Sequence, residues 1–349
     1  MKKEVYYSDY LQLEKILSSQ QPESGLTGSA AHDEMLFIIV HQTYELWFKQ
    51  LCHELKSVVA ILSKEEVSDN SPDIFIVVHR LKRVSSIWDL AIHQVGVIET
   101  MTPLDFLDFR EQLRPASGFQ SFQFKALEAM MGLKFDERHG QEFYRRHLRA
   151  EHQEMIAKVE SRPSLLELTV NWLERMPYFE KKYWTQSSYG SGSESHEHPF
   201  WVEYKAAYNT TLSTEDKQAL QAFNQVFFNL ENSERRFSDS ACRAALFIMA
   251  YRDYPLLQIP FQLLDTLITI DEQMATWRAR HISMVKRMIG SRAGTGGSTG
   301  AAYLKESRDR HLVYSELAEI SSFLVQRNNL PKLSPVLEKK LGFTAAATI

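Results

Sequence analysis

Cysteine is nearly absent from this chain: its 349 residues include only Cys52 and Cys242. Two cysteines cannot build a disulfide framework or a cysteine-based zinc site, and their scarcity fits a reducing compartment. Cys52 and His53 do not form a covalent haem attachment motif, because Lys49 stands where C-x-x-C-H needs its first cysteine. Any haem in this protein is therefore expected to be bound non-covalently.

Long hydrophobic runs and dense runs of one charge are also missing. No stretch approaches the roughly 20 uninterrupted apolar residues of a membrane-spanning helix, and the N-terminus MKKEVYYSDY has no apolar signal core. The net charge is −4, from 40 basic and 44 acidic side chains. These features argue against a membrane protein and against nucleic acid as the main partner. We expect a cytoplasmic protein that acts on small molecules.

Strand signals are weak throughout, whereas apolar residues recur at helical spacing, so we predict an all-α fold, a helical bundle. We expect a single domain over residues 1–349, with an appended helical excursion over about 187–235. The N-terminal arm, 1–31, is too short to be stable alone, so it must dock on its own subunit or on a neighbour. The clearest predicted helices cover 33–63, 73–99, a segment from Pro103, 126–133, 163–182, 241–254 and 263–288, and residues 200–230 are expected to form a helical hairpin. The first of these begins with Asp33 and Glu34, which suit the positive end of its dipole.

Two histidines lie on apolar helix faces. His281 follows Trp277 by four residues and precedes Val285 by four, while His41 shares a stripe with Phe37. One interpretation of each is a core histidine that is hydrogen-bonded to a neighbour. The other is a haem pocket, because a single histidine on a buried helix can hold the iron while a second face meets the substrate.

An arginine occupies a third apolar stripe. Phe106, Arg110 and Leu113 fall at i, i+4 and i+7 in the helix expected from Pro103, which would place them on one face. A guanidinium in such a position needs an anion. That anion is either a nearby protein carboxylate or a substrate carboxylate that the guanidinium binds through two hydrogen bonds.

The glycine-rich segment GTGGSTG, residues 294–300, does not match a known phosphate motif. It lacks the Lys-Ser/Thr of a P-loop, does not fit G-x-G-x-x-G, and follows a helix where both motifs follow a strand. Two interpretations remain open: a solvated linker, or a segment whose N–H groups and hydroxyls close over a small anion.

Three ordered motifs resemble the tryptophan 2,3-dioxygenase family. They are HDEMLFIIVHQTYELWFKQ, FREQLRPASGFQSFQF and WRxRHxxMVxRMIGxxxGTGGSTG, and the likeness extends from Tyr7 to about Pro335. The resemblance implies an all-α homotetramer, a dimer of dimers, that binds one non-covalent haem b per subunit. It also implies that L-tryptophan and O₂ are the substrates, and that cleavage of the indole C2–C3 bond gives N-formyl-L-kynurenine.

The same resemblance implies roles for individual residues. His281 would be the axial iron ligand and His41 the catalytic histidine near the indole N–H, with Ser117 and Gly294 close to the haem. Residues implied to bind the substrate are Phe37 and Phe106 around the indole, Arg110 and Thr295 at the carboxylate, and Tyr7 and Tyr10 from a neighbouring protomer.

The chain departs from the family pattern after the glycine segment, where Ala301 and Ala302 precede Tyr303. The alternative activity is that of related haem enzymes that monooxygenate indoles. A haem carrier without turnover is a second alternative, but it needs no carboxylate clamp such as Arg110 and Thr295. A purely structural bundle would have no reason to place both histidines on buried faces.

Overall fold

The computed structural model describes residues 4–26, 28–65, 71–135, 148–184, 198–212, 217–228, 235–290, 292 and 311–342. Within these ranges the chain forms helices joined by turns, and it contains no strand, which confirms the predicted all-α fold. No helix among the described residues combines the length and the apolar character that crossing a membrane requires.

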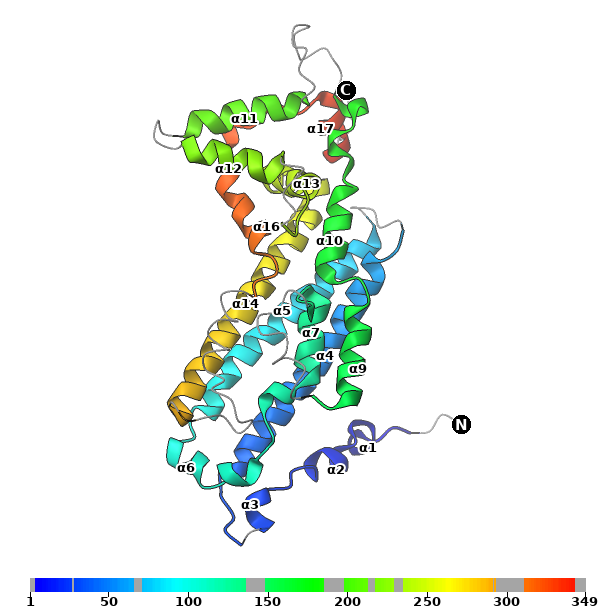
Figure 1. Ribbon diagram of the computed structural model, residues 1–349. Helices are drawn as coiled ribbons and strands as arrows, with labels where there is room; N and C mark the ends of the chain where they lie inside the picture. Colours follow the sequence, from blue (N-terminus) through cyan, green and yellow to red (C-terminus); the bar gives the residue numbers. More distant parts are fainter. Residues whose placement is uncertain are drawn as a thin grey trace.

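Three long helices form the body of the molecule: α4 (Glu34–Leu62), α5 (Pro72–Ile98) and α14 (Gln258–Ile289). Figure 1 shows α5 between the other two, with α4 running in the opposite direction to α5 and α14. The predicted helices over 33–63 and 73–99 are confirmed to within one residue. Pro72 starts α5 at a position where its missing N–H costs no hydrogen bond, and Gly290 ends α14 at a φ of 60°.

One end of this body carries most of the predicted site residues. The elements there are the start of α4, the end of α14, α6 (Pro103–Leu107), η1 (Arg110–Leu113), η2 (Gly118–Gln120) and α7 (Phe122–Met131). α7 begins four residues earlier than predicted, because the Ser121 hydroxyl caps it by accepting a hydrogen bond from the N–H of Phe124.

The helix predicted from Pro103 is broken, and the prediction that Phe106, Arg110 and Leu113 share one face of it is wrong. α6 starts at a capping box in which Thr102 and Asp105 each bind the other's backbone N–H, but it ends at Leu107. Phe109 then leaves the helical region with a φ of −127° and is fully buried. Burial of this ring against neighbouring aromatic side chains outweighs continuation of the helix.

The opposite end holds a larger group of shorter elements that share one hydrophobic core with the long helices. The predicted helix over 163–182 ends at Glu174 instead, because Pro177 cannot continue it. The elements at this end are α10 (Leu165–Glu174), η4 (Pro177–Phe179), η5 (Lys181–Tyr183), α11 (Pro199–Thr211), α12 (Lys217–Phe227), α13 (Asp239–Ala250), η7 (Pro255–Leu257), α16 (Ser315–Glu319), η8 (Ile320–Phe323), η9 (Arg327–Asn329) and α17 (Pro335–Leu341). The remaining helix, α9 (Ala150–Glu160), packs beside α7 instead (Figure 1).

The N-terminal arm consists of α1 (Tyr7–Leu11), α2 (Leu13–Leu17) and α3 (Glu23–Leu26), and it lies beside the end of the body where α4 begins (Figure 1). Gln12 separates the first two helices with a left-handed φ of 52°. Neither α1 nor α2 contains a buried residue. The arm therefore stays largely outside the core of its own subunit.

Candidate active site

His41 and His281 come from two different long helices and influence each other electrostatically. His41 lies in the second turn of α4, and His281 lies about two turns before the end of α14. An electrostatic effect of His41 adds to burial in lowering the pKa of His281, which indicates that the two imidazoles lie in the same region. The structure thus brings together the two histidines that the sequence marked separately.

The surroundings of His281 favour an imidazole that keeps a free electron pair. Burial, with a smaller effect of His41, lowers the pKa of His281 to about 4, so the ring is neutral at pH 7. Its ring stacks on Trp277, with centroids 5.3 Å apart and planes 5° from parallel. Among the described residues, none forms a hydrogen bond with the His281 side chain. A core histidine held by a hydrogen bond would need such a partner, and the described part of the chain does not supply one.

The wall behind His281 is aromatic. Trp277 packs against rings from three other helices at centroid distances between 5.1 and 6.0 Å. Those rings belong to Tyr44, Phe48, Trp88 and Phe124. Such a wall excludes water and fixes the tilt of the imidazole, which suits a ligand that must point in one direction.

The hydrogen bond that His41 forms fixes its tautomer. Its Nδ1 lies 2.7 Å from the carbonyl oxygen of Phe37, and a carbonyl only accepts, so Nδ1 carries the proton. Nε2 of the neutral ring is then an acceptor. Desolvation lowers the pKa of His41, although the Phe37 carbonyl and the Glu45 carboxylate act in the opposite direction. The ring is thus neutral at pH 7, with Nε2 able to accept a hydrogen bond.

Phe37 and Phe106 form the aromatic part of the site. Phe37 lies 4.1 Å from the His41 ring and 5.7 Å from the ring of Phe106, measured between centroids. Phe109, which sequence reasoning did not select, packs edge-on against both at 5.5 and 5.4 Å. Met288 of α14 joins the same cluster. The end of α14 that follows His281 is therefore in contact with the aromatic group beside His41.

Arg110 and Ser117 lie close in sequence to this cluster and differ in exposure. Arg110 is only 5% exposed, and its Nη1 lies 3.7 Å from the Glu111 carboxylate. Glu111 also pairs with Arg114, at 3.1 Å. The Ser117 hydroxyl caps η2 by accepting a hydrogen bond from the N–H of Phe119. The structure thus keeps a guanidinium buried at the start of η1.

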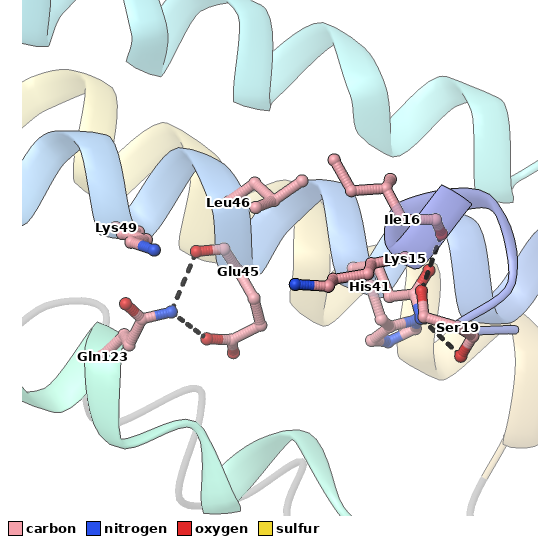
Figure 2. Close-up of a pocket in the computed structure, with 9 residues that line it drawn as sticks. Lys15, Ile16, Ser19, His41, Glu45, Leu46, Lys49 and Gln123 are labelled. Carbon is pink, nitrogen blue, oxygen red and sulfur yellow. Dashed lines mark hydrogen bonds between the residues drawn. The ribbon is translucent and has the colours of Figure 1, made fainter. Parts of the chain in front are cut away.

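A cavity of about 460 Å³ lies against His41, between the arm and the body (Figure 2). Figure 2 shows residues of the arm facing those of α4, with Gln123 of α7 on another side. Gln123 donates one hydrogen bond to the Glu45 carboxylate at 2.8 Å and another to the Glu45 carbonyl at 2.9 Å. The cavity is lined by Lys15, Ile16, Ser19, His41, Gln42, Glu45, Leu46, Lys49 and Gln123.

Two predicted site residues lie apart from this group, and two others fall outside the described part of the chain. Tyr7 and Tyr10 lie on α1 with 70% and 74% of their surfaces exposed, and they contribute nothing to the cavity of their own subunit. Gly294 and Thr295 lie outside the described residues, as do Ala301 and Ala302.

Several polar contacts near the site escaped sequence reasoning because their partners are distant in sequence. Glu34 is fully buried, and its carboxylate accepts hydrogen bonds from the N–H groups of Glu23 and Ser24 at 2.8 and 2.9 Å. One turn before His281, Arg278 forms a buried ion pair with Glu128 of α7 at 2.7 Å. A charged residue inside an otherwise apolar helix face was the only signal for this pair.

Comparison with known proteins places the chain in one family. The family profile described as tryptophan 2,3-dioxygenase matches residues 1–324. The chain belongs to the tryptophan 2,3-dioxygenase family. A tryptophan 2,3-dioxygenase of Alteromonas mediterranea is 41% identical, covering 98% of this chain and 99% of that protein. Tryptophan 2,3-dioxygenase B of Danio rerio is 41% identical and the Rattus norvegicus protein 40%, each covering 96% of this chain and 86% of its own length. The predicted family and the predicted dioxygenase class are confirmed.

The tryptophan 2,3-dioxygenase family is haem-dependent, and the residues present fit such a group. His281 offers a neutral imidazole, without a hydrogen-bond partner among the described residues, on an aromatic wall. Within the described ranges, no three His, Cys, Asp or Glu side chains gather into a site for a bare metal ion. One imidazole in an apolar setting suits an iron whose other ligands come from a porphyrin.

Proposed function

We propose that this chain is a haem b enzyme that cleaves the indole C2–C3 bond of L-tryptophan with O₂ and forms N-formyl-L-kynurenine, the first step of tryptophan catabolism. The observation that carries the proposal is a neutral His281, without a hydrogen-bond partner among the described residues, together with His41 and Phe37 in a chain of this family. His281 would hold the iron as its only protein ligand, with Ser117 and Gly294 close to the porphyrin. When bound, ferrous haem supplies the binding and activation of O₂.

His41 positions the indole. Its Nδ1 is engaged by the Phe37 carbonyl, which leaves Nε2 to accept a hydrogen bond from the indole N–H. An indole N–H is far too weak an acid for an imidazole to deprotonate at neutral pH, so we assign His41 a positioning hydrogen bond and not the role of a general base. Phe37 and Phe106, whose rings lie 5.7 Å apart, line the space for the indole.

Arg110 binds the substrate carboxylate, assisted by Thr295. Its buried setting strengthens a charge-assisted pair and restricts the guanidinium to few orientations. The carboxylate and the indole are then held by different elements, η1 and α4. This division fixes the register of the amino acid relative to His41 and predicts a preference for substrates that carry both groups.

The enzyme acts as a homotetramer, a dimer of dimers, in which Tyr7 and Tyr10 reach the active site of a neighbouring protomer. Support comes from the arm, where exposed apolar side chains lack cover within their own subunit: Val5, Tyr6, Tyr7, Tyr10 and Leu17 are each at least 70% exposed. Deletion of residues 1–12 should weaken both assembly and L-tryptophan affinity. A fully active monomer after this deletion would contradict the shared site.

A cytoplasmic location is also proposed, since both cysteines are buried and unpaired.

Isotope labelling tests the reaction. Insertion of both atoms of O₂ into L-tryptophan is balanced without an added electron donor. We expect the ferrous enzyme with L-tryptophan and ¹⁸O₂ to release a ring-opened product with two labelled atoms. A product with one labelled atom and an intact ring, formed only with added reductant or peroxide, would instead assign the chain to the indole monooxygenases.

A further inference from the structure

The N-terminal arm has two parts that differ in how they are attached. The part that follows α2 is attached to α4 of the same subunit through hydrogen bonds of Ser19, Gln20, Glu23 and Ser24, whereas α1 and α2 contain no buried residue. One attachment is the buried Glu34 carboxylate, which binds the N–H groups of Glu23 and Ser24. The other is Gln42, eight residues further along α4 or about 12 Å at 1.5 Å per residue. Phe37 and His41 lie between these two attachment points.

Gln42 uses both ends of its amide to hold the arm. Its Oε1 accepts a hydrogen bond from Nε2 of Gln20 at 2.7 Å, and its Nε2 donates to the carbonyl and the hydroxyl of Ser19 at 3.2 and 3.3 Å. These residues follow directly after α2. The contact therefore sets where the end of α2 lies relative to the turn of α4 that carries His41.

The end of α2 forms one wall of the cavity onto which His41 opens. Lys15, Ile16 and Ser19 line this wall, and His41 and Glu45 lie across from it (Figure 2). The cavity is thus bounded on one side by a short helix without a buried residue of its own. Without the contacts of Gln42, this wall would depend on the weak intrinsic stability of a five-residue helix.

We propose that Gln42 is a positioning residue of this enzyme: it holds the end of α2 against α4 and thereby limits the access of solvent and small solutes to the His41 imidazole. This inference rests on the function proposed above, in which His41 meets the indole. It also links the arm that reaches a neighbouring subunit to the turn of α4 that carries His41 in its own subunit.

Histidine acylation by diethyl pyrocarbonate, read by mass spectrometry on the substrate-free holoenzyme, tests the proposal. His93 is a matched internal reference, because its Nδ1 also lies 2.7 Å from the carbonyl four residues earlier, that of Asp89, and it is exposed, as His41 is, but lies away from the arm on α5. In Gln42→Ala we expect the acylation rate of His41 relative to His93 to rise about threefold to tenfold, the effect of losing one net hydrogen bond. The KM for L-tryptophan should rise more than kcat falls.

Gln50→Ala is the control variant. Gln50 lies on the same helix, and its amide donates to Glu54 at 2.7 Å instead of to the arm. The His41 to His93 ratio should stay unchanged there. The proposal is wrong if Gln42→Ala speeds hydrogen exchange at residues 16–20 while the His41 ratio does not change, or if exchange at those residues is unaffected.

Gln20→Ala provides a second variant that leaves α4 intact, should Gln42→Ala fail to fold. It removes the 2.7 Å contact from the arm side and should raise the same ratio in the same direction. No change of the ratio in Gln20→Ala would also contradict the proposed role of Gln42. The acylation ratio needs no turnover, so it tests Gln42 even if the isotope experiment rejects the proposed reaction.

Discussion

The two ends of the bundle use similar aromatic residues in different ways. At the end built on α11, α12 and α13, the rings of Phe200, Phe223 and Phe247 are fully buried, and the Tyr204 hydroxyl donates to the Phe323 carbonyl at 3.1 Å. At the other end, Phe37 is only half-buried and His281 has no hydrogen-bond partner among the described residues. Closely packed, hydrogen-bonded aromatics stabilise the fold. Aromatics beside neutral imidazoles and a cavity provide a binding site.

Among substitutions at the site end, we expect the largest effect from loss of the iron ligand. His281→Ala should abolish stable haem binding while the protein stays folded, because the same helix remains buried along the rest of its apolar face. Haem content and the Soret spectrum of the purified variant measure this. His93→Ala, on the exposed face of α5, should retain haem. A normal haem content and an unchanged histidine-ligated spectrum in His281→Ala would show that another residue holds the iron.

Truncating one ring at each end should separate stability from binding. Phe247→Ala removes a fully buried ring that contacts Tyr178 and Tyr251 at 4.8 Å, and should lower the free energy of unfolding by about 3–5 kcal/mol. Its KM for L-tryptophan should not change in the protein that remains folded. Phe37→Ala should cost clearly less stability and raise the KM. Denaturant titration and steady-state kinetics compare the two. Equal losses of stability would remove the distinction between the ends.

The carboxylate clamp should have the next largest effect. Arg110→Ala should weaken L-tryptophan binding at least about tenfold, since a charge-assisted pair contributes roughly 1.5–3 kcal/mol. Tryptamine, which lacks the carboxylate, should bind wild type weakly and should bind the variant no worse than wild type. Titration followed by the haem spectrum measures both ligands. Wild-type protein that binds tryptamine as tightly as L-tryptophan would contradict the clamp.

Local sequence pattern was sufficient for the long helices, because their apolar spacing continues over many turns, and it was sufficient to place Phe37 and His41 on one stripe. The pattern failed where a contact between residues distant in sequence determines the end of a helix or the partner of a side chain. The break after Leu107 follows from burial of Phe109 against Phe37, and the spacing of residues 103–113 contains no trace of that contact. Glu34 was expected to interact with the positive end of the dipole of its own helix, whereas its carboxylate accepts hydrogen bonds from the backbone of α3. The contacts of Gln42 with the arm are equally non-local.

The smallest expected effect concerns the charge of His41. Only the neutral ring accepts a hydrogen bond from the indole N–H, so L-tryptophan affinity should be constant near pH 7 and fall as His41 becomes protonated. Desolvation lowers the pKa of His41 from its usual 6.5, which places this fall below pH 6.5. The Glu45 carboxylate, held by Gln123, acts against this shift and raises the pKa. Glu45→Gln should therefore lower the pKa further.

The acid limb of kcat/KM against pH should accordingly move to lower pH in Glu45→Gln, by a fraction of a pH unit. The sign follows from the charge: without a nearby anion, the imidazolium is less stable, and protonation needs a higher proton concentration. Glu319→Gln, an exposed carboxylate on α16 at the other end of the bundle, should leave the limb in place. A limb that moves to higher pH in Glu45→Gln would mean that a group other than His41 controls binding in acid.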